Sequence, residues 1–348
     1  MSNTNEQLVG QLLIAGFRGK TAEEGSNIAS LINKYRISGV ILYDEDLEIG
    51  GPKSRNIESP QQVKKLIKQL QILSGHNLFI SIDQEGGEVR RLQSQYGFNE
   101  TPSWNHIGLL NNKLITKEFS DSLSSTLSEA GVNLNFAPVL DLDYGKGTVI
   151  SDSGRAFSLD PQIVIEHSRI LINSHKKKGV ITSGKHFPGL GSASGDTHEG
   201  YTDISDTWTV KDLIPFAELI HSNDLDMIMV SHAFDKKLDS LYPASLSKNI
   251  VTDMLRNDLG FNGVVICDDP SMRAISDHYN LEDTFELMLN AGIDLFCLGN
   301  NLIYDTNYIS KSVNAICNLI NTGKISVQRI QDSIIRINSL KKKYNINV

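Results

Sequence analysis

Short apolar runs rich in β-branched residues alternate along the chain with longer stretches in which apolar positions recur at helical spacing. The apolar runs predict eight strands, at residues 11–17, 38–43, 78–83, 133–141, 180–186, 227–232, 263–268 and 294–298. Helical segments lie between them at residues 60–73, 117–130, 161–178, 210–222, 248–259 and 281–290. Strands that are apolar on both faces and alternate with single helices predict a parallel sheet. Eight such units predict an α/β fold, the (β/α)8 or TIM barrel.

One domain is expected to account for the whole chain, residues 1–348. The sequence contains no Pro- or Ser-rich linker, no internal repeat and no low-complexity tract. Its 348 residues, 40% of them hydrophobic, suffice for the large core of a barrel. A further C-terminal helix at about residues 327–344 is expected to pack outside the barrel.

Polar and charged residues directly follow four of the predicted strands. Asp83 begins one cluster, Lys185 and His186 end a second strand, and His232 and Asp268 close two more. In (β/α)8 barrels the carboxyl ends of the strands carry the chemistry, so these side chains are expected to converge on one face. Each cluster alone could be an ordinary strand-terminating turn, but the four together indicate a functional site.

Composition and charge argue against several classes of protein. A formal net charge of −8 disfavours nucleic-acid binding, because neutralising phosphates requires a basic face. No window approaches the roughly eighteen uninterrupted apolar residues of a membrane span. The polar amino terminus lacks the basic start and apolar run of a secretory signal, and the three cysteines lack metal-ligand spacing. Both observations favour a cytoplasmic, reducing location.

The most informative motif lies at the end of the predicted strand 180–186. Lys185 and His186 lead through Phe-Pro-Gly at 187–189 into a loop of small residues that carries Asp-Thr-His at 196–198. Packing alone has no use for so many titratable groups, so the motif indicates a catalytic loop. It resembles the Lys-His-Phe-Pro-Gly segment and Asp-Ser-His loop of glycoside hydrolase family 3, in its β-N-acetylglucosaminidase branch. The resemblance covers nearly the whole chain.

The resemblance implies a retaining glycosidase. Asp268 matches the nucleophile of the family, with Asp269 as a supporting residue, and Asp196 and His198 match the pair that donates and accepts the proton. Asp268 and Asp269 would repel each other, so they need different environments to be ionised together.

Five residues are expected to bind the substrate: Asp83, Arg91, Arg155, Lys185 and His186. Two glycines follow Asp83 closely, and because they lack side chains a ligand can approach the backbone there. The carboxylate of Asp83 can accept hydrogen bonds from hydroxyl groups of a sugar. The resemblance implies that Asp83 and Arg91 bind hydroxyls of the terminal sugar, that Arg155 approaches the substrate, and that Lys185 and His186 contact it. Arg155 could instead form a surface ion pair, and His186 could be a core histidine whose ring is hydrogen-bonded to a backbone carbonyl.

Some features depart from the family pattern. Pro270 stands where the family usually has Leu, and Leu190 replaces a His between two glycines, so that both could shift loop geometry. The acidic, glycine-rich segment 43–55 looks like an insertion, and the sequence assigns it no function. His232 is expected only to line the site.

Taken with the resemblance, these features predict a cytoplasmic β-N-acetylglucosaminidase of peptidoglycan recycling. The expected partner is a small saccharide, a GlcNAc-containing 1,6-anhydro-muropeptide; no cofactor, nucleic acid or membrane is implied, and no oligomeric state is predicted. Two alternatives stay open. A metal-dependent hydrolase would use His186, His198, His232 and Asp268 as ligands, but it would leave Asp83 and Arg91 unexplained. A non-catalytic saccharide-binding relative is favoured only by Pro270 and Leu190.

Overall fold

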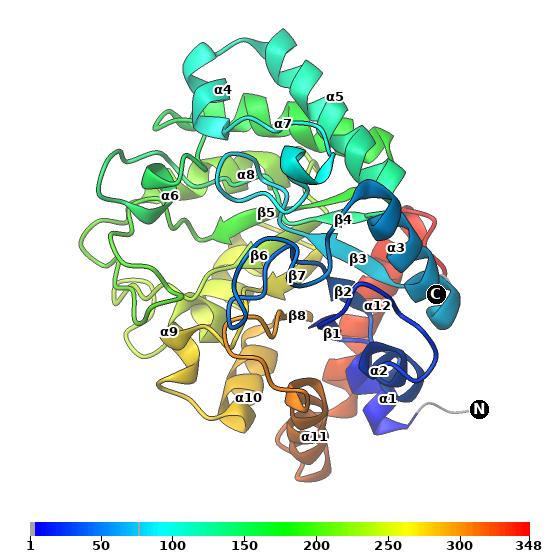
Figure 1. Ribbon diagram of the computed structural model, residues 1–348. Helices are drawn as coiled ribbons and strands as arrows, with labels where there is room; N and C mark the ends of the chain where they lie inside the picture. The colour runs from blue at the N-terminus through cyan, green and yellow to red at the C-terminus, as the bar shows by residue number, and fades with distance from the viewer. Residues whose placement is uncertain (1–3, 76) are drawn as a thin grey trace.

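Eight parallel strands close into a barrel in which neighbours in the sequence pair with each other and the last strand pairs with the first (Figure 1). They are β1 Leu13–Gly16, β2 Gly39–Ile41, β3 Phe79–Ile82, β4 Leu134–Asn135, β5 Ile181–Phe187, β6 Met227–Val230, β7 Val264–Cys267 and β8 Leu295–Leu298. This computed structural model describes residues 4–75 and 77–348. Residues 1–3, the start of the polar amino-terminal segment, therefore lie outside the described residues. The predicted (β/α)8 barrel is confirmed, and each predicted strand overlaps one observed strand.

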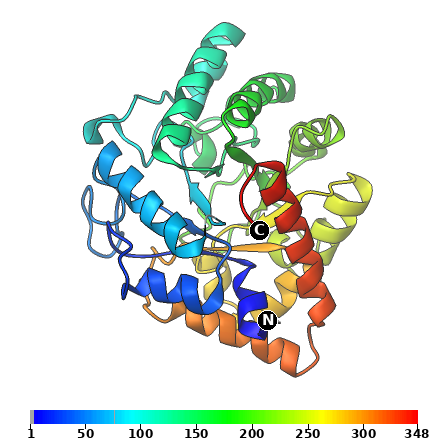
Figure 2. The ribbon, with the colours of Figure 1, turned by 90° about the vertical axis from the view of Figure 1, so that its right-hand side faces the viewer.

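Helices surround the strands on the outside (Figures 1 and 2). The helices are α1 Asn5–Gly10, α2 Asn27–Tyr35, α3 Pro60–Ser74, α4 Trp104–Leu110, α5 Lys113–Ala130, α6 Val149–Asp152, α7 Pro161–Lys177, α8 Ile214–His221, α9 Arg273–Ser276, α10 Leu281–Ala291, α11 Tyr308–Asn321 and α12 Val327–Lys343. Short 3-10 turns are η1 Ser94–Tyr96, η2 Val210–Leu213 and η3 Ala244–Leu246, and η4 Asn249–Asp258 is a π-helix. All predicted helical segments are found. Segment 210–222 divides into η2 and α8, however, and segment 248–259 adopts the wider π-helical turn.

Helix ends follow local capping chemistry. The side chain of Asn112 accepts hydrogen bonds from the backbone N–H groups of Leu114 and Ile115, which starts α5 earlier than the predicted residue 117. Gly131 ends the same helix with a left-handed φ of 94°, a conformation that costs glycine little. The chain then turns directly into β4.

Apolar side chains fill both the space between barrel and helices and the inside of the barrel. The interior cluster takes a buried residue from every strand: Ile14, Ile41, Phe79, Leu134, Ile181, Met227, Val264 and Leu295. The barrel is therefore a packed core, and a ligand can enter only beyond the ends of its strands.

Helix α12 covers the amino-terminal end of the barrel, a more specific position than the predicted place outside it. Leu340 of α12 and Ile346 beyond it join the interior cluster, and Lys341 lies over the ring of Phe79, the first residue of β3. Tyr344 donates a hydrogen bond to Asp226, which directly precedes β6. Figure 2 shows α12 running across this end of the molecule toward its middle. Among the described residues, no helix has both the length and the apolar character needed to cross a membrane.

Candidate active site

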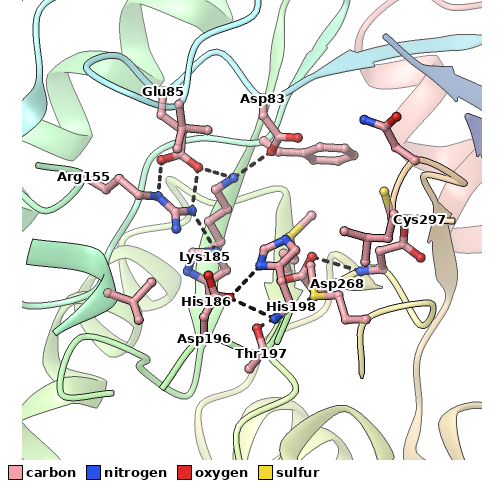
Figure 3. A pocket seen from close by; sticks show the side chains of 18 of the residues that line it. Asp83, Glu85, Arg155, Lys185, His186, Asp196, Thr197, His198, Asp268 and Cys297 are labelled. Carbon is pink, nitrogen blue, oxygen red and sulfur yellow. Dashed lines mark hydrogen bonds and ion pairs between the residues drawn. The ribbon is translucent and has the colours of Figure 1, made fainter. Parts of the chain in front are cut away.

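A pocket opens at the carboxyl end of the barrel, with lining residues from strands β2 to β8 or the loops that follow them. All eight predicted site residues line it: Asp83, Arg91, Arg155, Lys185, His186, Asp196, His198 and Asp268. Figure 3 labels all of them except Arg91. Lys185 and His186 belong to β5 and the other six to segments that follow strands, and the closed barrel brings them together because its strands all point the same way.

An ion-pair network occupies one side of the pocket (Figure 3). Lys185 Nζ lies 2.8 Å from Asp83 Oδ1 and 2.5 Å from Glu85 Oε1. The Arg155 guanidinium pairs with both oxygens of Glu85, at 2.7 and 2.8 Å. Burial alone would raise the pKa of Glu85, but Arg155 and Lys185 outweigh it and hold that pKa well below its ordinary value. Arg155 is thus part of a buried network and not of a surface ion pair.

His186 is held by Asp141, a residue at the end of the predicted strand 133–141. Its Nδ1 lies 2.6 Å from Asp141 Oδ2, while Arg155 donates to its Nε2 at 3.2 Å. Nδ1 therefore carries the proton that faces Asp141. Asp141 also accepts the backbone N–H of Leu190 at 2.7 Å, so one buried carboxylate orients the ring and fixes the start of the loop after β5.

Lys185 and His186 both reach the pocket although they are neighbours in β5. In a regular strand their side chains would point to opposite faces. The register between β5 and β6 shifts between Gly184 and Phe187, so the regular alternation is interrupted at these two residues.

The adjacent acids Asp268 and Asp269 lie in different environments. Burial would raise the pKa of Asp268, but nearby histidine rings and Lys185 outweigh it, and the pKa is lowered. Burial raises the pKa of Asp269 to about 6. Asp269 accepts the backbone N–H groups of Ser271 and Gly299, each at 2.9 Å, and so fixes the loops after β7 and β8. Asp268 is therefore the more readily ionised of the two.

His232 does not line the pocket as expected; its side chain is buried behind it. Nε2 lies 3.0 Å from the carbonyl oxygen of Asp269, and Nδ1 lies 2.7 Å from Ser245 Oγ. Because the carbonyl can only accept, Nε2 donates to it, and Nδ1 accepts from the serine hydroxyl. His232 thus supports the backbone beside Asp268.

Asp196 and His198 form a close pair at the edge of the pocket (Figure 3). His198 Nδ1 and its backbone nitrogen lie 2.7 and 2.9 Å from the same oxygen of Asp196. The hydrogen bond from His198 lowers the pKa of Asp196 to about 2. Burial opposes protonation of His198, but Asp196 and Asp268 outweigh it and raise the pKa of the imidazole.

The loop that carries this pair is attached to the segment after β7. The backbone N–H of Ala274 donates to the carbonyl of Thr197 at 3.2 Å, and the ring of Tyr201 meets that of His278 at 5.8 Å between centroids. The loop of Asp196 and His198 therefore rests on the same segment that follows Asp268.

Arg91 is positioned by Asp44 in the unassigned segment 43–55. A terminal guanidinium nitrogen of Arg91 lies 3.9 Å from Asp44 Oδ1, and its guanidinium lies 5.6 Å from the centre of the Tyr43 ring. Gln93 and Tyr96 donate to the other oxygen of Asp44, at 2.6 and 3.1 Å. A part of the segment therefore serves the site.

The histidines that the metal-dependent alternative would use as ligands form hydrogen bonds to other protein groups. Both ring nitrogens of His232 and of His186 are engaged in the hydrogen bonds given above, and His198 Nδ1 faces Asp196. In residues 4–75 and 77–348 no group of three or more His, Cys, Asp or Glu side chains is arranged to hold a metal ion. The geometry gives the metal-dependent alternative no support.

Sequence reasoning missed Glu85 and Asp141. Glu85 belongs to the polar run that begins at Asp83, and Asp141 ends a predicted strand, so position at a strand end was the available signal. The sequence does not reveal that Glu85 pairs with Arg155 or Asp141 with His186, because the two members of each pair lie far apart along the chain.

Comparisons with known proteins identify the family of the chain and agree with its fold. The family model described as "Glycosyl hydrolase family 3 N terminal domain" matches residues 4–340. A β-hexosaminidase from Nitrosomonas eutropha is 34% identical over 278 residues, which cover 76% of this chain and 74% of that protein. A structure of a glycoside hydrolase family 3 β-N-acetylglucosaminidase from Paenibacillus has a TM-score of 0.89 at 29% identity; the match covers 100% of this chain but only 64% of that one. A β-N-acetylhexosaminidase structure from Beutenbergia cavernae has a TM-score of 0.86 at 26% identity, covering 98% and 99%.

Proposed function

The chain belongs to glycoside hydrolase family 3, as a glycosidase of the β-hexosaminidase type, and on this premise we propose that it removes terminal β-linked N-acetylglucosamine with retention of anomeric configuration. The observation that carries the proposal is the joint placement of Asp268 and the Asp196–His198 pair in one pocket. Retention requires a nucleophile and a separate acid and base, and these residues have the chemistry for both roles.

In the proposed reaction a carboxylate oxygen of Asp268 attacks the anomeric carbon, and the bond between that carbon and the leaving oxygen breaks. His198 gives that oxygen the proton of Nε2, because Nδ1 is held by Asp196. The neutral Nε2 then accepts a proton from water, whose oxygen attacks the same carbon and breaks the ester to Asp268. The lowered pKa of Asp268 and the raised pKa of His198 favour the ionised nucleophile and the protonated acid that the first step needs.

The ion-pair network would bind the terminal sugar. Asp83 and Lys185 present an acceptor and donors for hydroxyl groups, and Arg91 stands beside them in the pocket. Glu85 and Arg155 hold these groups in place, so little order would have to be gained on binding.

The natural substrate we propose is a GlcNAc-1,6-anhydro-muropeptide, encountered in the cytoplasm. Its support is the resemblance of the chain to the β-N-acetylglucosaminidase branch of the family. Release of GlcNAc from purified anhydro-muropeptides at higher kcat/KM than from chitobiose, and recovery of the native protein in the soluble intracellular fraction, would agree with the proposal. Preference for chitobiose, or recovery outside the cell, would contradict it.

A glycoside screen followed by NMR tests the activity itself. The protein should hydrolyse nitrophenyl β-GlcNAc well and nitrophenyl β-glucose poorly, and β-GlcNAc should be the anomer that appears first. Retained activity in excess chelator would agree with metal-free chemistry. First release of the α-anomer would refute the double displacement, and no turnover would favour the non-catalytic alternative.

A further inference from the structure

The ion-pair network of the pocket is confined to one part of its lining. Asp83, Lys185 and their partners come from β5 and from the loops after β3 and β4, although Val89, Val149 and Leu190 add apolar surface there. Three apolar side chains line the pocket from other loops: Leu47 after β2, Met272 after β7 and Leu302 after β8. We call these three residues the apolar rim. We propose that the apolar rim is the subsite for the leaving group, taking the apolar ring face of a second sugar; this rests on the proposed function.

The positions of the reacting groups place the leaving group there. The hydroxyls of the terminal sugar belong beside Asp83 and Lys185, and its anomeric carbon must face Asp268 after β7. The leaving group departs on the face of the sugar away from Asp268, where His198 protonates its oxygen. Oγ1 of Thr197, the neighbour of His198, lies 3.8 Å from Sδ of Met272, so a leaving group protonated by His198 lies beside the apolar rim.

Leu47 is presented to the pocket by the segment 43–55. Glu45 and Leu47 line the pocket, whereas the side chain of Asp46 between them is turned into the protein and fully buried. A turn begins here, closed by a hydrogen bond from the backbone N–H of Gly50 to the carbonyl of Asp46 at 2.7 Å. Glu45 Oε1 accepts the backbone N–H of Gly51 at 2.9 Å, so its carboxylate is partly satisfied within the segment. The side chain of Leu47 is 56% exposed, and a ligand beside it would remove apolar surface from water.

Buried polar contacts fix this segment against the loop after β8. Asn301 accepts the backbone N–H of Leu47 at 3.4 Å and donates to the carbonyl of Glu45 at 3.1 Å. The fully buried Arg55 donates to Asn301 and to Asp46, at 2.7 and 2.8 Å. Leu47 and Leu302 are therefore held at defined positions before a substrate arrives, which lowers the cost of binding.

Kinetics with two alkyl glycosides test the proposal. Chitobiose and methyl β-GlcNAc both have leaving groups that depart as alcohols after receiving a proton, but only chitobiose has a second sugar. Leu47→Ala and Leu302→Ala should each lower kcat/KM for chitobiose about five- to tenfold and change it less than about twofold for the methyl glycoside. The matched controls are Ile49→Ala in the same segment and Ile303→Ala beside Leu302. Both residues are highly exposed, at 63% and 78%, and neither lines the pocket, so both substrates should be unaffected.

Other outcomes would overturn the inference. Equal losses on both substrates would mean that Leu47 and Leu302 act on the terminal sugar, and unchanged kinetics would mean that they touch no substrate. Losses in the controls as large as those in Leu47→Ala would assign the effect to loop structure. If the parent protein hydrolyses neither substrate, the proposed function fails and this inference with it.

Discussion

At the residue scale, chemistry is set by what surrounds each titratable group. Asp268 and Asp269 are adjacent, yet the pKa of the first is lowered and that of the second is raised to about 6. The difference arises because nearby histidine rings and Lys185 lower the pKa of Asp268, whereas burial raises the pKa of Asp269 by more than its hydrogen bonds from Ser271 and Gly299 lower it. Two like residues can therefore have separate roles.

Asp268→Asn should lower kcat about a thousandfold or more, because an amide cannot form the glycosyl ester. Asp269→Asn should retain more activity, since it disturbs backbone contacts without removing the nucleophile. A slow fluorinated GlcNAc donor, followed by peptide mass spectrometry, should label a peptide of the parent protein at Asp268. Label at Asp269 or elsewhere would show the assignment to be wrong.

His198→Ala should lose far more rate on chitobiose than in the glycosylation step with nitrophenyl β-GlcNAc. A nitrophenolate departs without a proton, whereas a sugar alkoxide needs one, so the two substrates separate acid catalysis from binding. Azide should restore part of the rate of the second step. Equal losses without rescue by azide would mean that His198 only positions the loop or the substrate.

Asp196→Asn should move the basic limb of the pH profile to lower pH. His198 must be protonated in the first step, so kcat/KM falls as pH rises through its pKa. Burial opposes the charged imidazole and Asp196 supports it, so loss of the carboxylate should lower this pKa. Profiles with chitobiose from about pH 5 to 9 would measure the shift. An unmoved limb would show that Asp196 does not tune the acid.

The sequence predicted which residues line the pocket better than it predicted which side chains they contact. All eight predicted residues line the pocket because each follows an apolar strand or a recognisable motif. The pairing of Glu85 with Arg155 was not predictable, because side-chain contacts between loops depend on the barrel register. Leu190, which departs from the family pattern, is 6% exposed, joins an apolar cluster with Ile150 and lines the pocket.

At the scale of elements, buried polar contacts hold the loops that surround the pocket. Asp46 accepts hydrogen bonds from both Arg18 and Arg55 and from the backbone of Glu48 and Ile49. The hydrogen bond from Arg18 lowers the pKa of Asp46 to about 2, so the carboxylate stays ionised. The segment 43–55 is therefore ordered from within, although many of its residues are exposed.

Arg55→Met should destabilise the protein by about 3 kcal/mol, because it breaks a fully buried ion pair and removes the donors to Asn301 and two backbone carbonyls. Arg18→Met is the matched control: it pairs with the same Asp46 but is 31% exposed, and its loss should cost about 1 kcal/mol. Chemical denaturation of both variants measures the difference. Equal small losses would show that the segment does not depend on Arg55.

The alternation of apolar strands and helices predicted the barrel because strands that are apolar on both faces need a packed interior on one side and helices on the other. It could not predict the π-helical turn of η4, since periodicity does not separate it from an α-helix over so few turns. Nor could it assign the segment 43–55, whose order comes from contacts with Arg18 and Asn301.

At the scale of the whole molecule, α12 ties together loops that precede separate strands. Asp294, directly before β8, lies 3.1 Å from Arg336 and accepts a hydrogen bond from Ser333 at 2.8 Å. Asn347, beyond the helix, donates to the carbonyl of Gly75 at 3.0 Å. The amino-terminal end of the barrel is thus closed by one continuous piece of chain, opposite the pocket.

Lys341→Met should stabilise the protein, by about 1–2 kcal/mol at pH 7. Burial lowers the pKa of Lys341 from 10.5 to about 7, so between these values the unfolded chain binds more protons and stability rises with pH. The advantage of the variant should be greatest below about pH 7 and should shrink toward pH 10. Thermal unfolding of both proteins across this range measures it. A constant difference would show that the charge of Lys341 is not responsible.

The position of α12 also determines how the protein can be attached to a support. Val348 is 59% exposed at the end of the chain opposite the pocket, whereas Ile346 just before it is 9% exposed. A bead or sensor surface joined through a spacer beyond Val348 would leave the entrance to the pocket facing the solution. Coupling chemistry that displaces Ile346 would instead disturb the packing of α12 and the residues after it against the amino-terminal end of the barrel. The immobilised protein would then unfold at a lower temperature, although its pocket would still be open to the substrate.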